Sequence, residues 1–353
     1  MQQALTSTKR LAKNTIMMYI RMGITMIVGL ISTRIVLQAL GEDDFGLYNA
    51  VSGIVVLITF LNNAMMLATQ RYLSYAIGEG SSTKLQDVFN ASVYIYLAIV
   101  ILIVLIGETV GLWFLNQKMV FADKIVLANF VYQFSLLITC FNVIRTPFNS
   151  LFVSIERMDF YALTSVVESC VNLCFVLLLL LFSSKASFLY IVLQTLAAFL
   201  ILIWVWAYFK KSFSTQIKFA KVEDKKLFKD LFSFSSWGMF GSLAVVGFQQ
   251  GINILLNMFF GVTVNAAFGI ANKVNSLVNQ FFTGFQTAAN PQITKAYASG
   301  DISAQVMLIN RTTKISFFLL LLVGTVVIYN TDFLLLIWLS EVPNYTVELA
   351  RLM

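Results

Sequence analysis

Histidine is absent from this 353-residue sequence, and charged residues make up only 12% of it. The lack of histidine excludes zinc sites built on imidazole, Ser-His-Asp and Cys-His catalysis, and proton relays through histidine. The three cysteines, Cys140, Cys170 and Cys174, all lie within apolar runs, so no disulfide framework is expected. The absence of histidine and the scarcity of cysteine argue against the common kinds of metal site and against enzymes that use a His-activated nucleophile.

Apolar side chains dominate what is present. Hydrophobic residues make up 59% of the chain, and the mean hydropathy is +0.82. A soluble protein is about half apolar and about 25% charged, because polar groups must coat its surface. Long apolar runs recur along this sequence, and the first continues to about Leu40, too far for a cleavable signal. The sequence therefore predicts an all-α polytopic membrane protein.

A helix needs about 20 mainly apolar residues to cross the hydrocarbon core. By this length the sequence predicts nine spans, and the start of a tenth near Tyr345. The predicted spans are 15–38, 47–69, 88–107, 125–146, 160–182, 187–209, 233–258, 266–289 and 313–330. The lysine-rich connection 210–232 predicts a basic strap lying against anionic head groups.

Lysine and arginine are distributed unevenly among the connections. They gather in the N-terminal segment and the even-numbered connections, whereas the odd-numbered connections contain only Lys118, Lys124 and Lys185. The positive-inside rule then places the N-terminus in the cytoplasm. The acidic run 42–44 falls in the first outward turn, where we expect a solvated polar tip; a site for external cations is the alternative.

Two stretches about 220 residues apart resemble each other. LGEDDFGLYN (40–49) precedes the second predicted span, and FGVTVNAAFGIAN (260–272) precedes the eighth. At the far ends of those spans, SYAIGEG (74–80) corresponds to AYASGD (296–301). A repeat unit of six spans plus the linker has an even number of spans, so the second copy keeps the orientation of the first.

This repeat predicts two parallel lobes related by a pseudo-two-fold axis along the membrane normal. The N-terminal lobe is a six-helix unit, 1–209, and the linker 210–232 leads to an incomplete C-terminal lobe, 233–353, with three helices and the start of a fourth. We expect a C-terminally truncated form of a longer protein. A naturally short homologue, or chance similarity between the turns, is the alternative.

Ionisable residues within spans are candidates for function, because each costs about 3 kcal/mol or more at the bilayer centre. Basic groups outnumber acids there: Arg21, Arg34 and Lys273 lie inside spans, and Arg71 and Arg145 lie at cytoplasmic ends. Guanidinium groups bind phosphate oxygens through a planar fork. These residues predict a cationic cavity, with anchoring at the interface by snorkelling as the alternative.

Glu168 is the clear acid within a span. It either pairs with an arginine such as Arg145 or couples transport to an ion. The eighth predicted span carries Asn272, Asn275 and Asn279 at spacings that share one helix face. That stripe predicts a polar lumen lining, and interhelical hydrogen bonds are the alternative.

Four features resemble one known family: KNT followed by Arg21, the motif R-x(5)-LGxxxFGLYN from Arg34, the helix end TQRYLSYAIGEG, and the amide-rich eighth span. They resemble the bacterial polysaccharide-biosynthesis flippases, which translocate O-antigen and capsule repeat units. That family is related to the lipid II flippase and more distantly to multidrug-and-toxin extruders. The resemblance implies two six-helix lobes around a cavity and no enzymatic activity; the family's twelve to fourteen spans exceed those predicted here.

The resemblance also implies a substrate. We expect an undecaprenyl-pyrophosphate-linked oligosaccharide to move from the cytoplasmic to the outer leaflet by alternating access, for lipopolysaccharide O-antigen or another surface polysaccharide. The implied location is the bacterial cytoplasmic (inner) membrane. Expected partners are the lipid-linked oligosaccharide, membrane lipids and other polysaccharide-assembly membrane proteins, without nucleic acid. No cofactor is expected, apart from coupling to an ion gradient or the membrane potential.

Two other function classes compete with this one. A multidrug or small-molecule exporter of the same superfamily is the main alternative, but the first span lacks the acid that related extruders use. A membrane glycosyltransferase or polymerase would usually need a large extramembrane loop with carboxylates, and the longest loop here is the lysine-rich linker.

Overall fold

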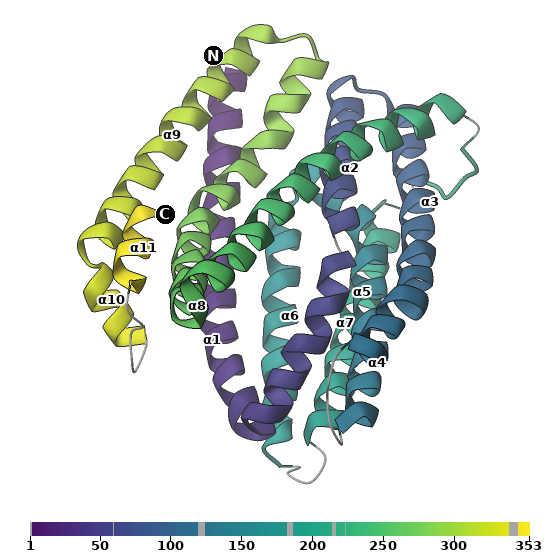
Figure 1. The fold of residues 1–353 in the computed structure, drawn as a ribbon. Helices are drawn as coiled ribbons and strands as arrows, with labels where there is room; N and C mark the ends of the chain where they lie inside the picture. Colours follow the sequence, from purple (N-terminus) through teal and green to yellow (C-terminus); the bar gives the residue numbers. More distant parts are fainter. Residues whose placement is uncertain are drawn as a thin grey trace. The chain divides into compact units, whose positions relative to one another are not determined.

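The computed structural model describes residues 2–58, 60–118, 124–181, 186–213, 217–222, 224–338 and 345–353. Every regular element in these ranges is helical (Figure 1), which confirms the all-α prediction. The chain divides into two compact units. Unit A comprises residues 20–239, and unit B comprises 1–19 and 240–353. Residues 1–19, assigned above to the N-terminal lobe, thus group with the C-terminal part of the chain.

Unit A contains most of the helices. It takes in the larger part of α1 and the first residues of α8, with six shorter helices between them and the π-helical turn η1. The elements are α1 (Gln2–Ile58), α2 (Phe60–Gly78), α3 (Ser82–Ile106), η1 (Gly107–Gly111), α4 (Leu112–Lys118), α5 (Ile125–Ser154), α6 (Met158–Leu179), α7 (Ala186–Phe213) and α8 (Lys225–Ala298).

Helix α5 is the centre of unit A, and it packs against α2, α3, α6 and α7. Its apolar side chains belong to two clusters of buried residues that fill the spaces between these helices. Close to the start of α5, Tyr132 donates its hydroxyl to the carbonyl of Gly107 in the π-helical turn, at 2.7 Å. A Cβ on Gly111 would overlap that hydroxyl, so this glycine permits the close approach of η1 to α5.

One end of unit A is tied together by Asp44. Its carboxylate pairs with Lys124 at 2.5 Å, directly before α5, and accepts a hydrogen bond from Ser187 at the start of α7. The first, third and fifth connections therefore meet at one end of the unit. At the other end the Ser154 hydroxyl donates to the Gln70 carbonyl at 3.1 Å, and Asn90 donates to the Lys218 carbonyl at 2.9 Å. This alternation agrees with successive spans that run in opposite directions.

Unit B contains the start of α1, most of α8, and three further helices. These are α9 (Ile302–Tyr329), α10 (Thr331–Trp338) and α11 (Thr346–Leu352). Within it, the hydroxyl of Tyr19 donates to the Phe281 carbonyl at 2.9 Å, and Phe285, Ala288 and Ala289 form a small buried cluster. The predicted start of a tenth span corresponds to the short α11.

The predicted repeat is visible in backbone hydrogen bonds. After α2, the amides of Gly80 and Ser81 donate to the carbonyls of Ile77 and Ala76. After α8, Gly300 and Asp301 make the same pair of bonds to residues 297 and 296. Both glycines have positive φ, +72° and +76°, as this helix-terminating motif requires.

The next residue in each copy starts the following helix. The hydroxyl of Ser81 accepts from the Lys84 amide, and the carboxylate of Asp301 accepts from the Ala304 amide. Each side chain thereby satisfies one of the free amides at a helix start. The offset is 220 residues at every bond, which supports the repeat inferred from SYAIGEG and AYASGD.

Several predicted boundaries were wrong. Helix is assigned through the two predicted outward turns at 40–49 and 260–272, so α1 and α8 have 57 and 74 residues and the predicted helix ends there are absent. A straight helix of 57 residues would be about 85 Å long, against a hydrocarbon core of about 30 Å. Figure 1 shows that α1 doubles back on itself instead. Part of the predicted linker 210–232 is also helical, since α7 ends at Phe213 and α8 begins at Lys225.

Five described helical segments are long and apolar enough to cross a membrane. They are Ser82–Gln117, Ile125–Ser154, Met158–Leu179, Ala186–Phe213 and Ile302–Tyr329. They contain or overlap the predicted spans 88–107, 125–146, 160–182, 187–209 and 313–330. The other four predicted spans lie on α1, α2 and α8 and stay predictions.

The Asp44 cluster makes unit A sensitive to acid. Burial raises the pKa of Asp44, but the hydrogen bonds from Lys124 and Ser187 and the lysine charge outweigh it, so the pKa is lowered. The stabilisation is therefore complete above the unfolded pKa of about 3.9 and disappears as the pH falls through the lower folded value. We expect Asp44→Asn to lower the Tm of the detergent-solubilised protein at pH 7, with the difference from wild type shrinking towards pH 3. A Tm difference that is independent of pH would contradict this account; Asp87→Asn on α3 is the control.

Candidate functional site

A polar cavity of about 390 Å³ lies within unit A, among α1, α5 and α6. Ligand pockets in proteins are typically about 300–1,000 Å³. Helix α6 supplies most of the wall, and α1 and α5 each supply an arginine and a second polar side chain one turn further on. A cavity lined this way is unusual in a chain that is 59% hydrophobic, and it is the first candidate for a functional site.

The wall from α6 is a continuous polar stripe. Its members follow one another at spacings of three or one residues, which keeps them on one face of a helix. They are Tyr161, Thr164, Ser165, Glu168, Ser169 and Asn172. The opposite wall carries Arg21 and Thr25 on α1, and Arg145 and Asn149 on α5, each pair at i and i+4.

Arg145 and Glu168 form an ion pair inside this cavity. The guanidinium Nη1 lies 2.8 Å from Glu168 Oε2, and Nη2 lies 3.2 Å from Oε1, so the pair is bidentate. The side chains are 13% and 27% exposed. A fork of two parallel bonds fixes the orientation of both groups. The pair also lowers the cost of placing either charge away from water.

Arg21 enters the same cavity from α1. Its guanidinium carbon lies 4.9 Å from the centroid of the Tyr161 ring, which is the geometry of a cation–π contact. An aromatic face attracts the cation without neutralising it. Two arginines and one glutamate therefore line the cavity, and its formal charge is positive by one.

Several buried polar atoms of the cavity have no hydrogen-bond partner among the described residues. They are Nε of Arg145 and the Oδ1 atoms of Asn149 and Asn172. Buried polar groups in folded proteins are nearly always satisfied, and the exceptions concentrate at sites that bind water or ligand. One charged donor and two amide acceptors are thus open to an occupant that is anionic and also carries hydroxyl groups.

The structure brings together three of the residues predicted from sequence. Arg21, Arg145 and Glu168 share the cavity. Arg71 is exposed and stacks over Phe234 at 4.8 Å, and it is not among the residues that line this cavity. The side chains of Arg34 and Lys273 lie outside the described part of the structure, so their predicted roles stay predictions.

The predicted asparagine stripe belongs to unit B. Asn272, Asn275 and Asn279 are all half-buried on α8. Asn279 Nδ2 donates to Asn275 Oδ1 at 2.7 Å, so two of the three amides bond each other along the helix. Their role in lining a lumen stays a prediction.

Sequence reasoning missed most of the polar stripe on α6. Of its six members, only Glu168 was singled out as a site residue. The signal was present, since 161, 164, 165, 168, 169 and 172 trace one face of a helix. Serine, threonine and tyrosine are common in membrane helices, however, and each alone indicates only local packing. Arg145 was predicted as a site residue because of its charge, whereas Asn149, one turn later and uncharged, was not.

A model of the family described as "Polysaccharide biosynthesis protein" matches residues 11–297, most of the chain. The chain belongs to this family. None of the curated proteins compared with the chain matches it. The family match confirms the resemblance stated from the sequence motifs.

The fold of the family member described here is that of the MATE transporters. An outward-facing multidrug resistance MATE family transporter of the MOP superfamily is 15% identical, with a TM-score of 0.86, and the match covers 98% of this chain and 78% of that one. A MATE transporter in the straight conformation is 16% identical, with a TM-score of 0.83 and the same coverage. A MOP superfamily transporter from Pyrococcus furiosus Vc1, described as having a binding pocket of reverse polarity, is 15% identical with a TM-score of 0.83, again over 98% and 78% of the chains. The chain is therefore a multi-pass membrane protein of a polysaccharide-biosynthesis family, with the fold of the MATE transporters.

The Arg145–Glu168 pair predicts a strong energetic coupling. Removing one partner leaves the other charge half-buried and alone, so we expect Arg145→Ala and Glu168→Ala each to destabilise the protein by about 1–3 kcal/mol, less than for a fully buried pair. The double variant should cost less than the sum of the two. Thermal unfolding in detergent, analysed as a double-mutant cycle, measures this coupling.

The control is the exposed pair of Arg157 and Asp159, whose side chains are 45% and 41% accessible. A cycle on that pair should give a coupling of about 0–1 kcal/mol. Equal couplings for the two pairs, or strict additivity at Arg145 and Glu168, would show that the cavity pair does not act as a unit.

Proposed function

We propose that this protein is a flippase that moves an undecaprenyl-pyrophosphate-linked oligosaccharide from the cytoplasmic to the outer leaflet, by alternating access, for surface polysaccharide biosynthesis. The observation that carries the proposal is the polar cavity of unit A, with two arginines, one glutamate and unsatisfied amides, in a chain of a polysaccharide-biosynthesis family. The O-antigen of lipopolysaccharide is one such polysaccharide.

The pyrophosphate would engage the arginines. It is a compact anion, and guanidinium groups match its oxygens with paired donors. Arg21 is held by the Tyr161 ring, and Arg145 keeps its Nε free of bonds to the described residues. An incoming phosphate would compete with Glu168 for Arg145. Such competition favours release of the substrate, because the ion pair between Glu168 and Arg145 re-forms when the phosphate leaves.

The hydroxyl-rich part of the substrate would engage the neutral polar groups. Asn149 and Asn172 present acceptors, and the hydroxyls of Thr164, Ser165 and Ser169 lie on the same stripe. Sugars offer many hydroxyl donors at close spacing, so a surface of amides and hydroxyls can hold different glycans without a fixed pattern. The proposal therefore does not specify one repeat unit.

A multidrug or small-molecule exporter is the second candidate, favoured by the likeness to MATE structures. The positive formal charge of the cavity disfavours cationic drugs. The reverse polarity described for the Pyrococcus furiosus transporter indicates that pocket charge differs among proteins of this fold. Anion transport is thus compatible with the fold.

We also propose that the protein lies in the bacterial cytoplasmic membrane with its N-terminus in the cytoplasm, as the lysine and arginine bias indicates. Lipid-linked oligosaccharide and membrane lipids would be its partners, together with other polysaccharide-assembly proteins. Glu168 is the candidate for any coupling to an ion gradient or the membrane potential, since its charge faces the same cavity. Arg34, Arg71, Lys273 and the stripe of Asn272, Asn275 and Asn279 remain further candidates for substrate contact.

Complementation tests the proposed function. The gene is expressed in a flippase-deficient strain, beside Arg21→Ala and Arg145→Ala variants at matched membrane abundance. Charge-assisted hydrogen bonds are worth about 1.5–3 kcal/mol, so we expect surface polysaccharide to fall by roughly 10- to 100-fold in each variant. Arg157→Ala, which removes an arginine outside the cavity, should retain full activity.

Two outcomes would overturn the proposal. Wild-type polysaccharide levels in both cavity variants would show that the cavity does not bind the substrate. Failure of the wild-type protein to restore any glycan in strains with different repeat units, together with restored drug tolerance in an exporter-deficient strain, would favour the multidrug alternative.

A further inference from the structure

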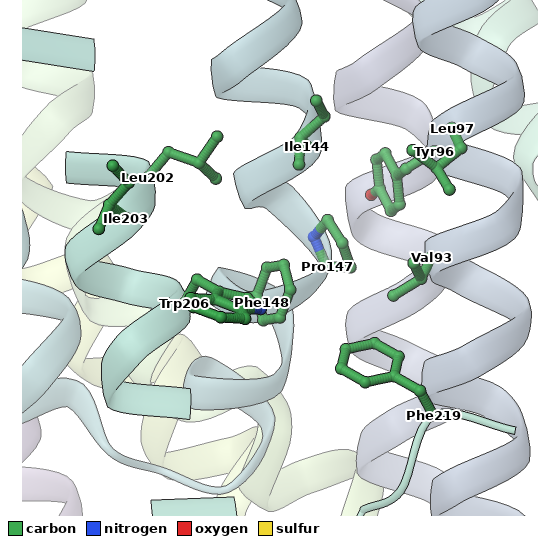
Figure 2. A pocket seen from close by; sticks show the side chains of 10 residues that line it. All are labelled: Val93, Tyr96, Leu97, Ile144, Pro147, Phe148, Leu202, Ile203, Trp206 and Phe219. Atoms are coloured by element: carbon green, nitrogen blue, oxygen red, sulfur yellow. The ribbon is translucent and has the colours of Figure 1, made fainter. Parts of the chain in front are cut away.

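A second cavity in unit A has the opposite chemistry. It is about 350 Å³ in volume and lies among α3, α5, α7 and the connection after α7. Figure 2 shows the ten side chains that line it, and all of them are apolar or aromatic. None of them lines the polar cavity, so the two are separate sites.

This cavity lies at an exposed flank of the unit. Leu97 on α3 and Ile203 and Trp206 on α7 line it, and they are 45%, 44% and 43% exposed. In a membrane, such side chains meet hydrocarbon. Pro147 lies in the α5 wall, between Ile144 and Phe148 (Figure 2). A proline within a helix removes one backbone bond and bends the helix, which opens space beside it.

One edge of the cavity is formed by the connection after α7, in the described residues 217–222. Phe219 forms part of the wall and packs against Phe89 and Phe209, with ring centroids 6.2 and 5.8 Å apart. The neighbouring Lys218 is held by its backbone, because its amide donates to Gln86 Oε1 and its carbonyl accepts from Asn90 Nδ2. The wall is therefore fixed by α3.

Basic side chains adjoin this edge. Lys210 Nζ lies 5.2 Å from the ring centroid of Trp206, which lines the cavity, and Lys218 directly precedes Phe219. Both lysines are exposed. An apolar cavity with Lys210 beside one lining residue, Trp206, and Lys218 next in the chain to another, Phe219, matches the two halves of an anionic lipid. On the orientation proposed above, this edge faces the cytoplasm, whose leaflet is the anionic one.

We propose that this cavity is a binding site for an anionic glycerophospholipid of the cytoplasmic leaflet. Part of one acyl chain occupies the slot among α3, α5 and α7, and the phosphate lies between Lys210 and Lys218. The site is distinct from the substrate cavity, and the proposal does not depend on the transported molecule. Bound lipid would brace the connection after α7 against α3.

Tryptophan quenching by brominated lipids tests this site. The full chain, keeping Trp206 as its only tryptophan through Phe substitutions at the other four positions, is reconstituted in phosphatidylcholine vesicles. Equal mole fractions of dibrominated phosphatidylglycerol or dibrominated phosphatidylcholine are then added. We expect phosphatidylglycerol to quench at about 25-fold lower mole fraction than phosphatidylcholine, since each of the two lysines contributes about fivefold, equivalent to ~1 kcal/mol.

Matched variants distinguish an effect of the two lysines at the cavity from a general attraction of anionic lipid to a basic protein. Lys210→Gln with Lys218→Gln should abolish the preference for phosphatidylglycerol, whereas Lys225→Gln with Lys226→Gln, the same charge change at the start of α8, should keep it. Val93→Phe, which fills the slot, should reduce quenching by both lipids. A version that keeps only Trp113, on α4, should show no preference.

Equal quenching by both lipids in the Trp206 protein would mean ordinary bilayer contact and would overturn the proposal. So would a preference that survives Lys210→Gln with Lys218→Gln. Native mass spectrometry of the chain with all its tryptophans provides a second readout. Wild type should retain phosphatidylglycerol over phosphatidylcholine, and the double lysine variant should lose that selectivity; equal retention by the two would contradict the site.

Discussion

A charge inside a membrane protein is costly unless another group of the protein compensates it, and unit A meets this constraint at Arg145 and Glu168. The two side chains form a bidentate pair, half-buried between α5 and α6. With two arginines and one glutamate, the lining of the cavity keeps a formal charge of plus one. The pair fixes how α5 and α6 face each other, and so it also places the hydroxyls and amides of the polar stripe.

Helix α5 lies between the polar cavity and the apolar one and lines both. Arg145 and Asn149 face the polar cavity, and Ile144, Pro147 and Phe148 line the apolar one. These two sets are interleaved in the sequence and separated only by the helical period of 3.6 residues. One central helix thus divides a space suited to a charged, hydroxylated ligand from a space suited to hydrocarbon. A change in the register of α5 would disturb both.

The sequence predicted the features that depend on composition and periodicity. Five apolar spans, the alternating ends of unit A and the repeat all follow from local patterns, and the repeat extends to matching backbone bonds after Gly80 and Gly300. The pairing of Glu168 with Arg145 was one of two alternatives left open, and the structure shows it. An isolated acid within an apolar span has few possible partners other than a nearby arginine.

Features that depend on tertiary packing were not predictable in this way. Both turns, 40–49 and 260–272, contain glycine, and the first also contains acidic residues; these residues indicate a break, yet helix is assigned through both turns. Asp44 was interpreted as a solvated tip, but it contacts Lys124 and Ser187, from connections 80 and 143 residues away. The threonines and serines of α6 became informative only when α1 and α5 were seen opposite them.

The most direct test of the account is whether the cavity binds a pyrophosphate and whether Glu168 competes with it. Calorimetric titration of the detergent-solubilised protein with farnesyl pyrophosphate, with farnesol as the uncharged control, measures this. Replacing Glu168 by glutamine removes the competing charge, so Glu168→Gln should bind farnesyl pyrophosphate about fivefold or more tightly than wild type, and Arg145→Ala should bind it at least about tenfold more weakly. The same Kd for wild type, Glu168→Gln and Arg145→Ala would contradict the claim that this ion pair forms the anion site.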